Sequence, residues 1–553
     1  MKRLLLLLAF AFIASVAHAQ GTYTAASCAH SDVNAVINGP THTAVAGDTI
    51  VIPTCTSTTP GGSNTWTTTL KITTPITLKG QGTGNTVLID AVATGGVGGN
   101  KCQGGGPLIS MMPSATTGWR ITGFTVYSAA NDSGACYAHI AVAGGSHSFR
   151  IDHLSFTNNC ANCTPAVGDD GIVADGYIWG VIDHNTFTGD RFRLLLDHAT
   201  VWGGTTHGKG DDSWADPDTM GTNQAVYVED NTITQTEANV GVNPLACEWG
   251  ARCVLRFNSV STVGSHGLDT SQPNRSVRHM EVYNNNFTAP AFHQGGANAV
   301  DIRGGTGMVF NNHALASAYL PANNGYILNV SYYRCNQSTA GCVTGVHPFG
   351  ECNGIIDGSN NGLWDQPGQY RCMDGIGTGQ GVLINRTGCA SSPPACTAAA
   401  WPNEAVDPVY EFNNNDDGTL NTAVNPSPAG TNPVQTLNNR DYYQGADCRI
   451  TSGSQTGGVC VGTFANLPTS CSANPHGGAG VGYWATDQGS WNTSGGNNMQ
   501  SYAGQGQLYV CTATNTWSLY YTPYTYPHPL TTGSGTTGSG TPSSPTNLQA
   551  VVN

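Results

Sequence analysis

Charged residues are scarce in this sequence, and basic ones especially so. Asp, Glu, Lys and Arg make up 10% of the 553 residues, whereas a typical soluble domain contains about 25%. Only 20 residues are Lys or Arg, and the formal net charge is −14. Because proteins that bind nucleic acids need clustered basic side chains to neutralise phosphates, this composition excludes nucleic acid as a partner.

Good helix formers and long apolar runs are also scarce. Glycine, which disfavours helices, occurs 72 times, and helix formers other than Ala are few. After residue 13, no stretch approaches the ~18 apolar residues of a transmembrane helix. Hydrophobic residues still make up 39% of the chain, and they recur with the two-residue period of strands. We therefore predict an all-β protein without a transmembrane segment.

The N-terminus has the pattern of an export signal. Lys2 and Arg3 give a basic start, residues 4–13 are apolar, and Ala17-His18-Ala19 is a small-x-small cleavage site. This pattern predicts a secretory signal over residues 1–19. We expect a secreted protein, either extracellular or periplasmic.

All 18 cysteines follow the predicted signal, and in an exported protein this even number predicts up to nine disulfides. Cysteines close in sequence predict five local bridges: Cys160–Cys163, Cys247–Cys253, Cys335–Cys342, Cys389–Cys396 and Cys448–Cys460. The alternative for Cys160 and Cys163 is half of a zinc site or a redox pair. No second CxxC motif accompanies them, which favours the disulfide.

A short pattern recurs through the middle of the chain: an apolar residue, two variable residues, Asn, one more residue, and an apolar residue. It places asparagines at Asn185, Asn231, Asn258, Asn285 and Asn312, the last four at intervals of 27 residues. A repeat of this length, built from short β-like runs, is typical of a parallel β-solenoid. Equivalent residues of stacked coils lie ~4.8 Å apart, so we expect a ladder of hydrogen-bonded amides. Asn also tolerates the left-handed turn conformation. The alternative is five unrelated turns.

These motifs resemble a known family. The segment Ile76-Thr-Leu-Lys-Gly-Gln-Gly82, followed by the repeated coils, is similar to the secreted right-handed parallel β-helix proteins of the pectin-lyase-like superfamily. The resemblance covers about residues 45–315, residues 410–415 are a candidate further coil, and residues 520–530 resemble the end of bacterial proteins with this repeat. The family includes polysaccharide lyases, hydrolases, epimerases and non-catalytic adhesins, so the resemblance implies the fold and leaves the function open.

We expect the following organisation. A signal peptide covers residues 1–19, and a right-handed parallel β-helix covers 20–445, with a disulfide-rich insertion at about 316–405. A small C-terminal β module, rich in Cys and aromatic residues, covers 446–530, and a flexible tail covers 531–553. The aromatic residues of the module either pack a small core, which is favoured, or form a sugar-stacking surface. A monomer is expected.

Acidic residues follow apolar core positions in five strands: Asp175, Asp197, Glu248, Asp269 and Asp301. Because side chains alternate between the two faces of a strand, these acids are predicted to form one outward column. Like charges at this spacing repel, and Ca²⁺ would offset the repulsion, since it prefers carboxylate oxygens. Glu248, Asp269 and Asp301 are the expected calcium ligands, and no organic cofactor is expected. The alternative is a solvated face.

The same column supplies candidate catalytic residues. His266 is the expected acid–base residue, because imidazole titrates near neutral pH, and Asp269 and Arg303 complete the expected catalytic group. Arg193, Asp175 and Asp197 are expected to contact substrate, the arginine by pairing with an acidic sugar.

The predicted function is a secreted carbohydrate-active protein that binds an extracellular acidic polysaccharide. Cleavage by β-elimination would use a cation to neutralise the sugar carboxylate and a base to remove the neighbouring proton. Two alternatives stay open: a non-catalytic surface, adhesion or structural β-helix protein, and a glycoside hydrolase, which needs two carboxylates at a defined separation. Whether the protein is an enzyme is left open. Among enzymes, a lyase is favoured over a hydrolase.

Overall fold

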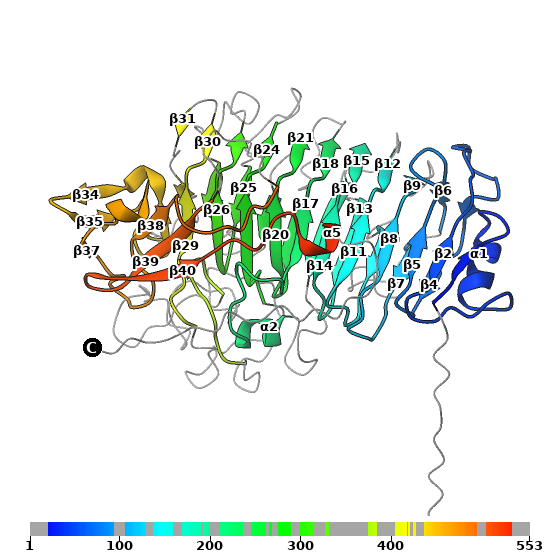
Figure 1. The fold of residues 1–553 in the computed structure, drawn as a ribbon, viewed down its shortest axis with the longest axis horizontal. Coiled ribbons are helices and arrows are strands. Elements are labelled where there is room, and N and C mark those ends of the chain that lie inside the picture. The colour runs from blue at the N-terminus through cyan, green and yellow to red at the C-terminus, as the bar shows by residue number, and fades with distance from the viewer. Residues whose placement is uncertain are drawn as a thin grey trace, which may run out of the picture.

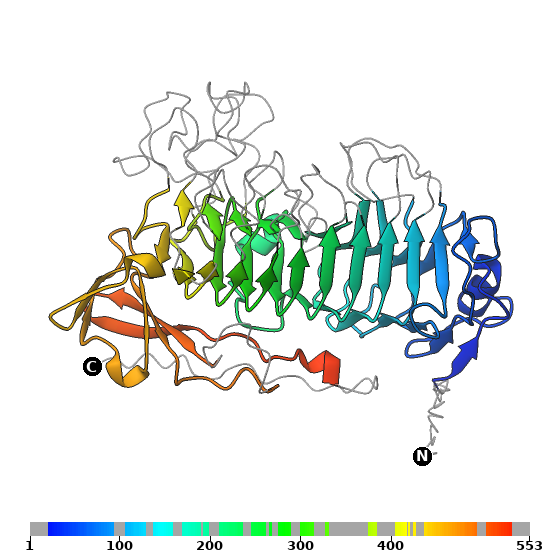
Figure 2. The same ribbon diagram turned by 90° about the horizontal axis from the view of Figure 1, so that it is seen from above.

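Three long sheets, almost entirely parallel, dominate the computed structural model, as Figures 1 and 2 show. The structure describes residues 20–92, 106–128, 137–158, 169–189, 192–197, 210–235, 245–261, 265–267, 275–288, 299–314, 327–330, 374–383, 404–416, 419–420, 424–426, 436–494 and 505–532. The neighbours in each long sheet come from successive coils of the chain, which defines a parallel β-helix. The predicted fold class is confirmed.

The twelve-stranded sheet forms one side of the solenoid. Its strands, in spatial order, are β1 (Thr22–Thr24), β2 (Thr49–Val51), β5 (Thr77–Lys79), β8 (Arg120–Thr122), β11 (Phe149–Asp152), β14 (Gly180–Asp183), β17 (Val226–Glu229), β20 (Arg252–Arg256), β23 (His279–Tyr283), β26 (Thr306–Phe310), β29 (Val409–Phe412) and β33 (Tyr442–Gln444). The pairing of β29 with β26 confirms that the chain forms a further coil at residues 410–415.

The ten-stranded sheet carries the predicted acidic column. Its strands are β4 (Leu70–Ile72), β7 (Ile109–Met111), β10 (Tyr137–Val142), β13 (Asp169–Asp175), β16 (Phe192–Asp197), β19 (Leu245–Glu248), β22 (Ser265–Gly267), β25 (Val300–Ile302), β28 (Leu328–Val330) and β32 (Asn425–Pro426).

The eleven-stranded sheet closes the coils. Its strands are β3 (Thr65–Trp66), β6 (Val87–Asp90), β9 (Thr125–Ser128), β12 (Ser155–Asn158), β15 (Thr186–Gly189), β18 (Thr232–Gln235), β21 (Ser259–Ser261), β24 (Asn286–Phe287), β27 (His313–Ala314), β30 (Asn415–Asp416) and β31 (Thr419–Leu420). Only the last pair, β30 and β31, is antiparallel.

Apolar side chains from all three sheets fill the interior of the coils. Ile182, Val228, Leu255 and Val282 lie in register on neighbouring strands, and each is fully buried. Burying such side chains contributes about 1.5–3 kcal/mol each, so the repeated apolar positions hold the coils in register.

The repeated asparagines stack at the corner between the twelve- and eleven-stranded sheets. Each side-chain amide donates to Oδ1 of the next asparagine at 2.9–3.1 Å, in the order Asn185, Asn231, Asn258, Asn285, Asn312 and Asn414. Backbone N–H groups donate to the same Oδ1 atoms. The column therefore supplies the hydrogen bonds that a buried corner needs.

At each corner, the residue with the left-handed backbone conformation is the one directly before the ladder asparagine. His184, Asp230, Phe257, Asn284 and Asn311 have φ between 53° and 57°. The expectation that the ladder Asn itself takes this conformation is corrected: its amide must stay in the column, so the sharp turn falls one residue earlier.

The two ends of the solenoid are covered differently. Helix α1 (His30–Ile37) buries Val33, Val36 and Ile37 against the first coils. At the other end lie two small sheets: β34 (Arg449–Thr451), β35 (Ser454–Gly457) and β37 (Ser470–Cys471), and β36 (Val459–Gly462), β38 (Gly482–Ala485), β39 (Gln507–Ala513) and β40 (Thr516–Tyr521). The 3₁₀ turns η3 (Gly445–Asp447) and η4 (Phe464–Asn466) flank these strands. Helix α2 (Asp211–Ala215) lies on the side of the solenoid.

After β40, residues 522–532 return along the outer face of the twelve-stranded sheet, and we call them the C-terminal strap (Figure 1). The strap ends in α5 (Pro529–Thr532), which contacts β14. Tyr521, Tyr526 and His528 are each at most 3% exposed. The aromatic residues of the module and the strap therefore pack mainly against the solenoid.

Two of the five predicted disulfides lie within the described residues, and both are present: Cys247–Cys253 and Cys448–Cys460. Cys160–Cys163, Cys335–Cys342 and Cys389–Cys396 lie outside those residues, as do the predicted signal and residues 533–553. Two longer bridges, Cys28–Cys55 and Cys471–Cys511, were not predicted.

Among the helices of the described ranges, none is both long enough and apolar enough to span a membrane.

Candidate functional site

Three of the five predicted acids lie in register on the outer face of the ten-stranded sheet. Asp175 pairs with Asp197, and Asp197 pairs with Glu248, on β13, β16 and β19. Their neighbours Ala174 and Cys247 belong to the interior core, so alternation directs these positions outward. Asp175 is 8% exposed and Glu248 is 2% exposed. These two carboxylates are therefore buried, and the alternative of a solvated acidic face is wrong for them.

Asp301 does not continue this column. Its backbone is in register with His266, and His266 is in register with Ala246. Asp301 therefore lies in the row of Ala246, two residues before Glu248 along the strand direction. Glu248 and Asp301 are two residues apart along the strand direction and two coils apart across the sheet, so their Cα atoms are about 12 Å apart. Ca²⁺ needs each ligand oxygen within about 2.6 Å of the ion. The two acids therefore lie in different rows of the sheet, and calcium binding by Glu248, Asp269 and Asp301 stays a prediction.

Asp269 lies outside the described residues, so its expected roles stay predictions. Within the described ranges, no three His, Cys, Asp or Glu side chains are close enough together to hold a metal ion.

A second polar group lies on the same face, further along the solenoid. Arg303 Nε donates to Asp301 Oδ2 at 2.9 Å, and Asn329 Nδ2 donates to Asp301 Oδ1 at 2.9 Å. The side chains of Arg303 and Asp301 are 16% and 17% exposed. The backbone of His266 pairs with that of Asp301. We call His266, Asp301, Arg303 and Asn329 the outer-face group.

The predicted substrate contacts on β16 lie at opposite ends of that strand. Arg193 pairs with Asp170, whereas Asp197 pairs with Asp175. Four residues along a strand span about 13 Å, so Arg193 is not beside the acidic row of Asp197.

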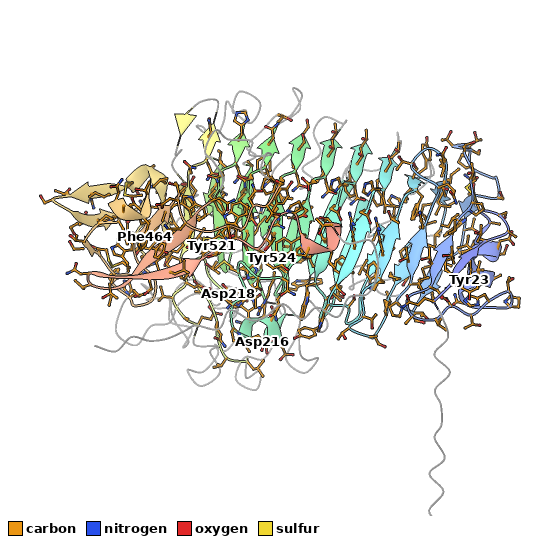
Figure 3. All side chains as sticks on the ribbon, viewed as in Figure 1. Tyr23, Asp216, Asp218, Phe464, Tyr521 and Tyr524 are labelled. Atoms are coloured by element: carbon orange, nitrogen blue, oxygen red, sulfur yellow. A yellow bond between two sulfur atoms is a disulfide. The ribbon has the colours of Figure 1, made fainter. Side chains whose placement is uncertain are left out.

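No sequence pattern predicts the pair that the buried imidazole of His279 forms with the partly exposed carboxylate of Asp218 on the twelve-stranded side. Asp218 Oδ1 lies 2.7 Å from His279 Nδ1, and His279 Nε2 lies 4.0 Å from Glu281 Oε1. Glu281 also accepts from the Gly221 backbone N–H and the Tyr521 hydroxyl. Figure 3 shows Asp218 near α2, and Tyr521, the last residue of β40, directly before the strap.

Electrostatics set the charge states in this cluster. Although burial favours the neutral acid, His279, Arg278 and Arg252 together hold the pKa of Asp218 well below its usual range. Burial raises the pKa of Glu281 despite the nearby His279. His279 is 0% exposed, so this cluster ties the 217–221 segment and the end of β40 to the sheet. Its members are 61 and 240 residues apart in sequence, and no local motif signals the contact.

A second buried cluster anchors the described parts of the insertion. Arg275 donates to Asp374, Asp211 and Glu404 with nitrogen–oxygen distances of 2.7–2.9 Å. Burial, and then the charge of Asp374, raise the pKa of Glu404 well above its usual range. One arginine therefore joins three separate segments of the chain.

His153 and His184 occupy equivalent turns and stack with their ring centroids 5.3 Å apart. Each Nδ1 lies 2.6–2.8 Å from the preceding aspartate, Asp152 or Asp183. The hydrogen bond to Asp183 raises the pKa of His184.

The fold defines the class of this molecule: it is a parallel β-helix protein with a polar group on the outer face of one long sheet. No model of a known protein family matches the sequence, and no curated protein matches it. Among solved structures, an alginate lyase from a Paenibacillus species is similar, with 14% sequence identity and a TM-score of 0.26, over 56% of this chain and 98% of that chain. A likeness this distant says nothing about the activity of this protein.

Proposed function

We propose that the protein binds an extracellular acidic polysaccharide along the outer face of its ten-stranded sheet, at the outer-face group. The observation that carries the proposal is the partly exposed ion pair between Arg303 and Asp301 on that face. Guanidinium groups recognise carboxylates through directed, charge-assisted hydrogen bonds, so Arg303 is suited to a uronate sugar. Four disulfides among the described residues fit an oxidising compartment outside the cytoplasm.

An outward row of positions on the ten-stranded sheet leads to the outer-face group. Pairing in register links, in spatial order, Lys71, Ser110, Ala141, Val173, Leu195, Ala246, His266, Asp301 and Asn329. Neighbours in such a row are ~4.8 Å apart. Polar residues stand at both ends, where Lys71 is exposed and Asp301 is partly exposed. Ala141, Val173 and Ala246 between them are at most 4% exposed, so the proposal places the polymer contacts at the polar residues.

We extend the proposal to cleavage by β-elimination, with His266, Asp269 and Arg303 as the catalytic group. The His266 imidazole takes the proton from the carbon that bears the uronate carboxylate. A carbon–carbon double bond forms as the bond from the adjacent carbon to the glycosidic oxygen breaks, and that oxygen takes up a proton. Arg303 stabilises the carboxylate as charge develops on it. The parts given to His266 and Asp269 rest on backbone register and on the sequence.

A glycan panel tests the proposal. Pectate, alginate and glycosaminoglycans are assayed for binding, for ultraviolet absorption of unsaturated products and for new reducing ends, with dextran as the uncharged control. Binding of an acidic chain with unsaturated products is expected. Binding without any product would make the protein a non-catalytic surface protein, and reducing ends without unsaturation would make it a hydrolase. No binding to any acidic chain, or equal binding to dextran, would overturn the proposal.

A further inference from the structure

A cavity of about 310 Å³ lies beside the strap, whereas the outer-face group lies on the ten-stranded sheet. Four segments form its wall: the turn at Gly221, the segment around Ser490 and Trp491, the start of β39 at Gln507, and the strap from Thr522 to Thr525. Figure 3 shows Tyr524 in the strap over the middle of the twelve-stranded sheet. The volume is at the lower end of the range for small-molecule sites.

The chemistry of the wall is polar but uncharged. Ser490, Gln507, Thr522 and Thr525 carry hydroxyl or amide groups, and none of the described residues that line the cavity is charged. Gln507 Nε2 donates to Thr522 Oγ1 at 2.9 Å, which joins the module to the strap across the cavity wall. Hydroxyl and amide groups of this kind both donate and accept hydrogen bonds, as sugar hydroxyls require.

Two aromatic residues, Trp491 and Tyr524, also line the cavity. Trp491 is 3% exposed, and its indole Nε1–H is buried away from the cavity. Tyr524 is only partly buried, so its ring offers the larger aromatic surface to a ligand.

We propose that this cavity is a binding site for one neutral sugar residue. The ring of Tyr524, beside the accessible edge of Trp491, would contact the apolar C–H face of the sugar, and the uncharged polar side chains would hydrogen bond its hydroxyl groups. The absence of charge among the described lining residues disfavours a uronate here. The site is therefore distinct from the acidic-polysaccharide face and does not depend on that proposal.

The test measures binding of methyl glycosides of glucose, galactose and mannose to the full chain by saturation-transfer NMR, with sodium glucuronate as the charged comparison. Ser490→Trp fills the cavity from an exposed position, so the fold should survive. Ser494→Trp makes the same change at an exposed serine of the same segment that does not line the cavity. At least one neutral glycoside should bind the parent and Ser494→Trp, and Ser490→Trp should weaken that binding about tenfold or more.

Gln507→Met provides a second test of the cavity if Ser490→Trp lowers the melting temperature. Gln507→Met keeps the length of the side chain but removes its hydrogen-bonding groups, and it too should weaken binding. If no neutral glycoside binds the parent, if glucuronate binds better, or if binding survives unchanged in Ser490→Trp and Gln507→Met, the proposal is overturned.

Discussion

Arg256 and Glu229 form an ion pair in which both side chains are fully buried, with Arg256 Nε 2.7 Å from Glu229 Oε2. They lie in register on neighbouring strands of the twelve-stranded sheet. The Arg256 guanidinium also donates to the backbone carbonyls of Tyr524 and Thr525 in the strap, at 2.7 and 2.9 Å. The pair therefore fixes the strap to the solenoid as well as compensating its own charges.

Replacing Arg256 tests this role. In Arg256→Met, Glu229 is left as a buried carboxylate without its cation, and two strap carbonyls lose their donors. We expect a loss of about 3–5 kcal/mol in the free energy of unfolding, measured by urea denaturation, and faster proteolysis of the strap. Adding Glu229→Gln should restore part of the loss, because it removes the uncompensated charge. Arg449→Met, at an exposed arginine, is the matched control; a similar loss there would contradict the explanation.

The asparagine ladder should be strongly stabilising in its middle. Asn258 Nδ2 donates to Asn285 Oδ1 and to the carbonyls of Val228 and Arg256, and its Oδ1 accepts from Asn231. Asn258→Ala leaves several buried groups unpaired at about 1–3 kcal/mol each. We expect a total loss of at least about 3 kcal/mol in unfolding free energy. The exposed Asn38→Ala should change it by less than about 0.5 kcal/mol, and equal effects of the two changes would rule out the ladder as the cause.

The interior carboxyl of Glu411 should make stability depend on pH. Glu411 lies in register with the core residue Val309, and burial raises its pKa to about 7. Because the folded pKa is raised, the contribution of this group is fully present below about pH 4.5 and is lost as pH rises through about 7. The loss amounts to at most about 3 kcal/mol.

Glu411→Gln removes this titration and keeps the hydrogen-bonding geometry. Chemical denaturation at about pH 5 and about pH 8 should show the variant gaining stability relative to the parent at the higher pH. A difference between the two proteins that stays constant across this range would show that Glu411 does not titrate in it.

Arg303 should control binding of acidic chains. Arg303→Met removes the cation of the outer-face group, and we expect at least about a tenfold loss of affinity for the acidic polysaccharide found by the panel, or about 1.4 kcal/mol. Asp301→Asn removes the competing carboxylate and should leave affinity unchanged or raise it. Lys79→Met changes an exposed cation on the twelve-stranded sheet and serves as the control. Equal losses in Arg303→Met and Lys79→Met would indicate only a general charge effect.

The disulfides should differ in what they contribute. Cys471–Cys511 closes a loop of 40 residues, and Cys247–Cys253 closes one of 6. Loop entropy predicts about 4 kcal/mol for the first and about 2 kcal/mol for the second. Replacing each pair by serine and measuring unfolding should show the larger loss for Cys471–Cys511, with early proteolysis between residues 446 and 521. A larger loss at Cys247–Cys253 would contradict the entropic account.

Much of the solenoid can be predicted from the sequence because its pattern is local. The interval of 27 residues between Asn231, Asn258 and Asn285 is one coil, so equal spacing in sequence becomes stacking in space. Cys247–Cys253 and Cys448–Cys460 follow from proximity along the chain for the same reason.

The outer face is harder to predict, because alternation fixes only the face and not the register. A strand shifted by two residues presents the same face. The sequence pattern is therefore the same whether Asp301 lies in the row of Ala246 or in the row of Glu248. Segments of unequal length separate the strands of the ten-stranded sheet, and only the paired backbones decide between the two.

The sequence by itself therefore determined the β-helix and its asparagine corner, because Asn231, Asn258, Asn285 and Asn312 repeat at a fixed interval of 27 residues. The tertiary structure alone decided the return of the strap over Arg256, the contact of Asp218 with His279, and the bridge from Cys471 to Cys511. These contacts join residues tens to hundreds of positions apart. They depend on how a loop and the C-terminal segments fold back over the solenoid, and no periodic pattern in the sequence encodes that path.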